Sequence, residues 1–238
     1  EAIEKDVADL LEDKNGVKGF KNTEDEAEFF LENDSDIALD NGYNFKNTIS
    51  ALIAEQVFKG KKGDVFGPYK DNGYFKISKI NEVVQIPDSV KGAHILIPFI
   101  GSVSADINTK RTAEQAKKTV DSIFKLVRRN KKKFTTIADE LNPDGTKGKG
   151  GDIGWVTKNQ AYASSFDVDF ANYLFFNKSG DIKVVKTKFG YHIIRIDESK
   201  NKQQAFKLVT FGRKIEASEA TENMIFQDAE SFALSFWK

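Results

Sequence analysis

The chain contains no cysteine and only two histidines among its 238 residues. The absence of thiols excludes disulfides, thiolate nucleophiles and zinc sites built from cysteine. With two histidines available we predict no metal site. We also predict no cofactor, because the glycine- and lysine-rich run 145–151 lacks the Gly-Lys-Ser/Thr ending of a phosphate-binding loop. Cysteine-free proteins occur in reducing and oxidising compartments alike, so this absence leaves the compartment open.

The chain also lacks an excess of charge of either sign and any long apolar run. Lys plus Arg and Asp plus Glu both total 36, so no global charge favours binding to nucleic acid. No apolar run approaches the roughly 18 residues of a membrane span. The first residue is Glu1, and no signal peptide is recognisable there. We interpret the chain as the soluble part of a longer protein, membrane-anchored only if an anchor lies outside this sequence.

The two histidines each begin a β-branched run that predicts a strand. His94 precedes Ile-Leu-Ile, and His192 precedes Ile-Ile. A single histidine in a half-buried strand is more often structural than functional. Here the pair accompanies a glycine turn at 150–154 and two phenylalanines, Phe166 and Phe170. This combination favours a functional site.

Three motifs in this region, taken together, resemble the parvulin family of peptidyl-prolyl cis–trans isomerases. They are His-Ile-Leu at 94–96, Gly-Gly-Asp-Ile-Gly-Trp at 150–155, and Phe-Gly-Tyr-His-Ile-Ile at 189–194. They occur in the family's order within about a hundred residues. The resemblance implies an α+β fold, in which a four-stranded antiparallel sheet is wrapped by helices and binds extended peptide around proline.

The resemblance also implies a set of site residues. His94 and His192 would lie side by side on neighbouring central strands, hydrogen-bonded to each other, with Thr187 in the network behind them. Asp144 falls where family members carry cysteine or aspartate near the rotating carbonyl. The implied catalytic residues are His94, Asp144, Thr187 and His192, and the implied proline pocket consists of Ile153, Phe166 and Phe170. Taken alone, Asp144 would be a turn residue, and the phenylalanines would be core residues.

Two departures from the family pattern qualify this site. Phe166 stands where the family usually has methionine or a similar apolar residue, and it lies several residues further from Trp155 than usual. The loop 99–109 contains no arginine, whereas phosphate-specific family members carry an arginine cluster there. We therefore predict no requirement for phosphate before proline.

The residues before the motif region contain an internal repeat of it. Gly-Asp-Val at 63–65 and Gly-Tyr at 73–74 match Gly-Asp-Ile at 180–182 and Gly-Tyr at 190–191. At that constant offset Phe75 takes the place of His192, and no counterpart of the glycine turn exists. We interpret this part as a silent parvulin-like module that lacks its opening strand.

Helical and strand periodicities outside the motif region predict further elements. In the N-terminal part they are a helix from Ile3 to Asn15, a helix that begins at a Thr23–Glu26 capping box, a loop through Asn44, a helix at 48–58, and strands around 63–69 and 71–77. In the middle a further helix begins at a Thr112–Gln115 capping box. The C-terminal part contains a strand at 205–215 and a helix that Ser218 caps and that carries Ile225, Ala229, Phe232 and Phe236.

These elements predict three domains. They are a degenerate, truncated parvulin-like module at 1–86, a parvulin isomerase domain at 87–200, and the strand–helix start of a further module at 201–238. The last piece could complete the first module of the same chain or that of a neighbour in a swapped homodimer. A three-part array in which the ends stay separate is the alternative.

The sequence predicts a peptidyl-prolyl isomerase and foldase that acts non-covalently on Xaa-Pro bonds of unfolded or secreted proteins. The alternative function is a catalytically vestigial chaperone that binds extended polypeptides. The predicted partners are unfolded, proline-containing polypeptides and not nucleic acid. The predicted location is the periplasm, by resemblance to multi-module foldases that combine silent and active parvulin units.

Overall fold

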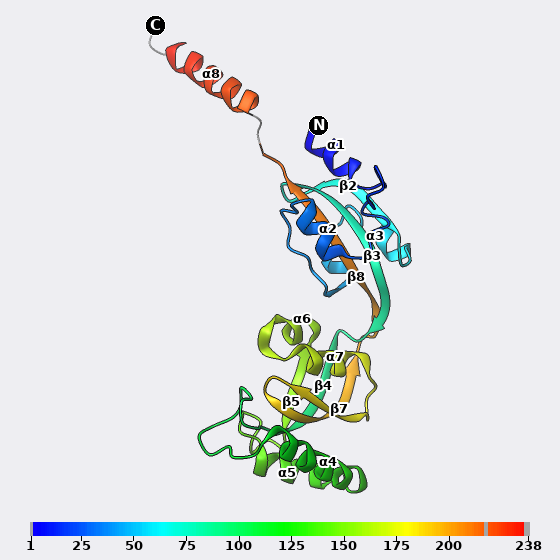
Figure 1. The fold of residues 1–238 in the computed structure, drawn as a ribbon, viewed down its shortest axis with the longest axis vertical. Helices are drawn as coiled ribbons and strands as arrows, with labels where there is room; N and C mark the ends of the chain where they lie inside the picture. Colours follow the sequence, from blue (N-terminus) through cyan, green and yellow to red (C-terminus); the bar gives the residue numbers. More distant parts are fainter. Residues whose placement is uncertain (1, 217–218, 236–238) are drawn as a thin grey trace. The chain divides into compact units, whose positions relative to one another are not determined.

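The computed structural model describes residues 2–216 and 219–235 and divides the chain into two compact units (Figure 1). Unit 1 combines the N-terminal part, up to Val84, with the C-terminal part from Ala205. Unit 2 is the continuous segment Gln85–Gln204. Each unit contains one four-stranded antiparallel sheet with helices packed on it. The predicted α+β class is confirmed.

Unit 2 has the strand order β5-β4-β7-β6, which places the two histidine-bearing strands next to each other in the middle. Its strands are β4 (Ser89–Ile97), β5 (Asp152–Thr157), β6 (Ile182–Thr187) and β7 (Gly190–Lys200). Its helices are α4 (Ala113–Arg129), α5 (Lys133–Leu141), α6 (Lys158–Gln160), the π-helix η2 (Ala161–Ser165) and α7 (Val168–Phe176).

Helices cover both faces of this sheet. On one face α4 and α5 bury Val120, Val127 and Phe134 against Ile95 and Ile193. On the other face α7 buries Leu174 and its neighbours against the opposite side of the same strands. The predicted capping box is confirmed at the start of α4. There the Thr112 side chain accepts from the Gln115 N–H and the Gln115 side chain accepts from the Thr112 N–H.

Unit 1 has the strand order β1-β8-β3-β2. Its strands are β1 (Tyr43–Phe45), β2 (Val65–Asp71), β3 (Tyr74–Ile86) and β8 (Gln203–Lys214), and its helices are α1 (Ala2–Asp9), α2 (Glu26–Glu32), the 3-10 helix η1 (Lys46–Thr48), α3 (Ala54–Lys59) and α8 (Glu219–Ser235). One core contains Phe29 and Phe30 of α2 with Phe211, and the other contains Val57 of α3 with Phe206.

The predicted C-terminal strand exists, and it is an interior strand of the unit 1 sheet. β8 pairs with β1 through Phe45 and Ala205, and its other neighbour is β3 (Figure 1). Phe206 and Phe211 of β8 are fully buried, one in each core. The N-terminal part of the chain and its C-terminal strand therefore build one sheet. β8 supplies the strand that the N-terminal module lacks.

The helix predicted after this strand is α8. Its apolar side chains Met224, Ile225, Phe226 and Phe232 are exposed. Two of the predicted residues, the cap Ser218 and Phe236, lie outside the described part of the chain. Within that described part, no helix is both long and apolar enough to cross a membrane.

Several predicted boundaries in the N-terminal part are wrong. The first helix ends at Asp9, because the chain turns there and the Phe20 N–H bonds the Leu10 carbonyl. The cap of α2 is Asp25 and not Thr23, since the Asp25 carboxylate accepts from the Glu28 N–H. The helix predicted at 48–58 is confined to α3, and the predicted loop contains the short strand β1.

The β2–β3 hairpin of unit 1 repeats the β6–β7 hairpin of unit 2, with one difference in register. At the turn before β2, the Gly63 N–H bonds the Ile80 carbonyl, as the Gly180 N–H bonds that of Ile196. A β-bulge then adds one residue to β2 between Phe66 and Tyr69. Because of this extra residue, residues of the two hairpins that are equivalent in the structure after the bulge are separated by one residue fewer than the residues that match in the sequence repeat.

This shift changes which residue is the counterpart of His192. The pair Tyr69–Lys76 corresponds to Val185–His192, since each is the third pair before the hairpin turn. Lys76 therefore takes the place of His192, and the prediction that Phe75 does so is wrong. Phe75 packs on the opposite face, in the core that α1 and α2 cover.

Candidate active site

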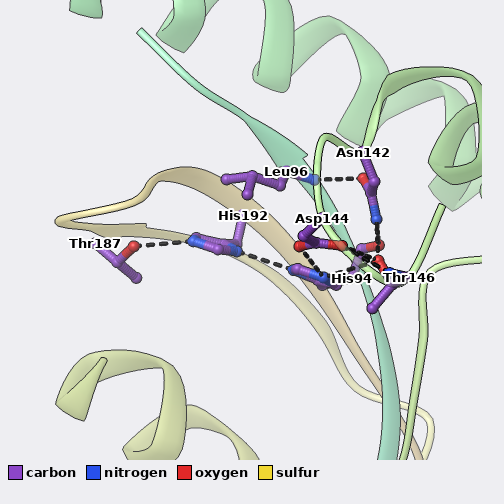
Figure 2. A network of polar contacts seen from close by, with 7 residues as sticks. All are labelled: His94, Leu96, Asn142, Asp144, Thr146, Thr187 and His192. Carbon is purple, nitrogen blue, oxygen red and sulfur yellow. Dashed lines mark hydrogen bonds and ion pairs between the residues drawn. The ribbon is translucent and has the colours of Figure 1, made fainter. Parts of the chain in front are cut away.

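The two histidines meet across neighbouring strands in the middle of the unit 2 sheet. Their Nδ1 atoms are 3.0 Å apart, and the rings stack with centroids 5.3 Å apart (Figure 2). The register pairs His94 with Ile194 and Leu96 with His192, so both rings project from the same face. That is the face on which α7 packs. Both side chains are buried, His94 at 6% and His192 at 3% exposure.

A polar network extends from the pair in both directions. On one side the Thr187 hydroxyl is 2.8 Å from His192 Nε2 and also accepts from the Phe189 N–H. On the other side His94 Nε2 lies 3.1 Å from Asp144 Oδ2 and 3.2 Å from Thr146 Oγ1. Figure 2 shows these contacts as one continuous chain from Thr187 to Asp144.

The direction of the hydrogen bonds follows from the two ends of this chain. An ionised Asp144 can only accept, so His94 donates from Nε2. A singly protonated His94 then accepts at Nδ1 from His192, whose Nε2 accepts from the Thr187 hydroxyl. Every polar atom of the pair is satisfied in this arrangement, which is what burial requires.

The pKa values of His192 and Asp144 agree with this direction of the hydrogen bonds. Burial, followed by electrostatic repulsion from His94 when that ring is protonated, lowers the pKa of His192 to about 3, so the His192 ring is neutral at physiological pH. Partial burial of Asp144 opposes ionisation. The hydrogen bonds from His94 and Thr146 outweigh it and hold the pKa of Asp144 below its usual range.

The loop that carries Asp144 is anchored to β4 by Asn142, which is fully buried. The Asn142 side chain accepts from the Leu96 N–H at 2.8 Å and donates to the His94 carbonyl at 2.9 Å. It also donates to Thr146 Oγ1 at 2.7 Å, and Thr146 in turn donates to Asp144 Oδ1 at 2.5 Å. The loop is therefore fixed at both ends of the Asp144 turn (Figure 2).

The glycine motif holds the other side of His94. The Gly151 carbonyl accepts from the His94 N–H at 2.9 Å. Gly151 has φ +78°, and a Cβ there would overlap the His94 carbonyl oxygen. Only glycine combines that backbone conformation with such a close approach to the histidine strand.

A cavity of about 510 Å³ opens beside the histidines. The Phe170 ring lies nearly perpendicular to both imidazoles, with centroids 5.6 Å from His94 and 5.1 Å from His192. Phe166 stacks on Phe170 at 5.3 Å, and Ile153 of β5 completes an apolar wall. The polar rim includes Ser104, Asp144, Thr146, Lys149, Asp152 and Asp167.

Six of the residues implied by the family resemblance line this one cavity, namely His94, Asp144, Ile153, Phe166, Phe170 and His192. Thr187 does not line the cavity, but its hydroxyl contacts two residues that do, His192 and Phe189. Asn142, Thr146 and Phe189 also belong to the site and were not predicted. A signal for the first two was available in the turn sequence Asn-Pro-Asp-Gly-Thr at 142–146, whose side chains favour local hydrogen bonds.

The described residues include no group of three His, Asp or Glu side chains that could hold a metal ion. The site can act by gripping an apolar ring and presenting fixed hydrogen-bonding groups to it.

Comparison with known proteins gives one family and a consistent set of relatives. A family model described as the PPIC-type PPIASE domain matches residues 75–200. The Chaperone SurA of Yersinia pestis bv. Antiqua (strain Antiqua) is 26% identical over 207 residues, which cover 80% of this chain and 44% of that protein. The Foldase protein PrsA of Staphylococcus aureus (strain Newman) is 37% identical over 122 residues, which cover 50% of this chain and 36% of that protein.

A similar solved structure is that of PrsA from Bacillus subtilis. It is 29% identical, covers 48% of this chain and 37% of the other, and superposes with a TM-score of 0.36. The chain thus spans less than half the length of the curated relatives it matches.

Proposed function

Because the chain belongs to the PPIC-type peptidyl-prolyl isomerase family, the parvulins, we propose that unit 2 catalyses cis–trans isomerisation of Xaa-Pro bonds in unfolded polypeptides. Family membership confirms the resemblance that the three motifs carried. The observation that carries the catalytic proposal is the unbroken polar chain from Thr187 to Asp144, running along the wall of an aromatic cavity.

Isomerisation of a prolyl bond requires the enzyme mainly to position the substrate and the polar groups around its amide. Rotation about a prolyl amide has a barrier of roughly 18–20 kcal/mol and breaks no covalent bond. In the twisted transition state the amide loses conjugation, so its nitrogen accepts hydrogen bonds better and the group is less polar. An enzyme accelerates rotation by binding the twisted form more tightly than the planar forms.

The residues of the site divide these tasks. Phe166, Phe170 and Ile153 hold the proline ring and exclude water from one side of the amide. Asp144, with its lowered pKa, places a negative charge beside the rotating carbonyl. The contact from His94 fixes Asp144, and the neutral His192 adds no charge to the site.

The clients we propose are extended, unfolded segments of secreted proteins, consistent with relatives named as a chaperone and a foldase. A periplasmic location stays a prediction. Fractionation of cells that produce the full-length protein tests it.

The decisive experiment is a prolyl isomerisation assay on short Xaa-Pro peptides with the full chain. We expect acceleration by the wild type and a loss of roughly tenfold or more for Asp144→Ala, because the charge beside the carbonyl is removed. Asp121→Ala, a change of an exposed acid on α4, serves as the control and should match the wild type. If the wild type accelerates no Xaa-Pro peptide, catalysis is refuted and the vestigial chaperone remains.

A further inference from the structure

Unit 1 contains a cavity at the place that corresponds to the active site of unit 2. The two sheets share one strand order, with β2, β3, β8 and β1 in the places of β6, β7, β4 and β5. The hairpin register makes Lys76 the counterpart of His192 and Asp71 the counterpart of Thr187. Both residues line a cavity of about 550 Å³, close to the volume beside the histidines. We call this cavity the unit 1 pocket.

The polar groups of the unit 1 pocket form a different network from that of the active site. Lys76 Nζ lies 2.8 Å from Asp71 Oδ2, so an ion pair replaces the histidine–threonine contact. Tyr69, Ser78 and Thr210 form a second chain, with both O···O distances at 2.8 Å. The chain's two histidines both lie in unit 2. The unit 1 pocket therefore has the place and the approximate volume of the active-site cavity without its catalytic groups.

The pocket lining combines apolar side chains with partly exposed polar groups. Ile49 and Ile53, from the segment between η1 and α3, and Leu208 of β8 supply apolar side chains. Among the described residues, the Ser50 hydroxyl and the amide nitrogen of Asn44 have no hydrogen-bond partner. One donor and one group that both donates and accepts are thus available to an incoming main chain.

The charge of the lining favours a basic ligand. Its charged groups are Asp40, Asp71 and Lys76, and the last two are paired with each other. Asp40 uses one carboxylate oxygen to accept from the Gly42 N–H and leaves the other open. One net negative charge therefore faces a ligand at the rim.

We propose that the unit 1 pocket is a second, non-catalytic binding site for an extended segment of unfolded polypeptide, which needs no proline and prefers a basic side chain. It rests on the proposed function only in taking unfolded polypeptides as clients. A client held there would present neighbouring segments to unit 2 at a raised effective concentration.

The test measures binding of two fluorescein-labelled, proline-free peptides to the full chain by anisotropy. One contains Ser, Ala and Val with a single Lys, and the other has Glu in place of that Lys. Ala51 and Ala38 line the pocket and are exposed, so Ala51→Trp and Ala38→Trp each add a bulky side chain at its lining. We expect each variant to weaken binding of the Lys peptide by about tenfold. Ala27→Trp, at an exposed position of α2 outside the pocket, should bind as the wild type.

The charge preference has its own variant. The wild type should bind the Lys peptide roughly two- to threefold more tightly than the Glu peptide, and Asp40→Asn should remove that difference. Thermal melting verifies that each variant is folded. If both tryptophan variants bind like the wild type, the proposal is wrong. Because neither peptide contains proline, a failure of the isomerisation assay would leave this result unaffected.

Discussion

His192 is the most buried titratable group of the site, and its burial makes the stability of the folded chain depend on pH. Its pKa in the folded chain is about 3, while a histidine in an unfolded chain titrates near 6.5. Between these values the unfolded chain binds more protons than the folded one. The folded state therefore loses stability as the pH falls through this window. Asp144, with its lowered pKa, extends the loss below about pH 4.

We predict that the melting temperature of unit 2 decreases steadily from about pH 7 to about pH 4. His192→Phe should melt at a lower temperature at neutral pH, because the Thr187 hydroxyl and His94 lose their partner. The same variant should also show a shallower decrease with acidification. Calorimetry across the range measures both effects, and equal slopes for the two proteins would contradict the assignment.

Thr146 links three parts of the site, since its hydroxyl contacts Asn142, Asp144 and His94. Thr146→Val should reduce kcat/KM by roughly tenfold, because Asp144 loses one of its fixing bonds and the buried Asn142 loses an acceptor. Thr146→Ser keeps the hydroxyl and should restore activity to near the wild-type value. Equal activity of the serine and valine variants would show that the hydroxyl positions nothing.

The loop between α5 and β5 contains both Asp144 and Gly151, two of the residues that contact His94. Gly151 and Gly148 both have positive φ, at +78° and +75°, but only Gly151 approaches the histidine strand. A Cβ on Gly148 would meet nothing within 4 Å. Substituting each glycine by alanine therefore separates the free-energy cost of the left-handed backbone from the cost of steric overlap with the histidine strand.

We predict that Gly148→Ala destabilises the chain by about 1–2 kcal/mol, the cost of a left-handed conformation. Gly151→Ala should cost about 2–4 kcal/mol, because overlap with the His94 carbonyl is added. It should also lower isomerase activity, since it displaces the bond from the His94 N–H to Gly151. Chemical denaturation measures the difference, and equal destabilisation would contradict the packing argument.

The N-terminal and C-terminal parts of the chain contribute strands to one sheet. β8 brings Phe206 and Phe211 into the two cores of unit 1, whereas unit 2 is built from a continuous segment. We predict that deletion of 203–238 abolishes the unfolding transition of unit 1 and leaves that of unit 2, because only unit 1 loses core side chains. Differential scanning calorimetry distinguishes the transitions.

The same deletion tests the swapped homodimer. If β8 is exchanged between two chains, the intact protein elutes as a dimer on size-exclusion chromatography and the deleted protein as a monomer. If unit 1 keeps its transition after the deletion, β8 contributes nothing to its stability and the shared sheet is refuted.

Local patterns in the sequence determined much of this protein. The Thr112–Gln115 capping box, the two glycine-ended hairpins and the strands that follow His94 and His192 are set by neighbouring residues, so they could be predicted from short windows. The three parvulin motifs identified the family for the same reason. Asn142 could not be assigned from such a window, because its partners are main-chain groups of β4 that lie more than forty residues away.

Only the tertiary structure decided the place of Lys76 and the partner of β8. One extra residue in the β2 bulge reverses which face each later side chain of the hairpin occupies relative to the sequence alignment, and the extra residue is visible only in the hydrogen-bond register. Likewise, the 205–215 pattern predicted a strand but not its neighbours. A strand pairs with whichever edge the rest of the fold leaves open, and here β3 and β1 provide the edges beside it.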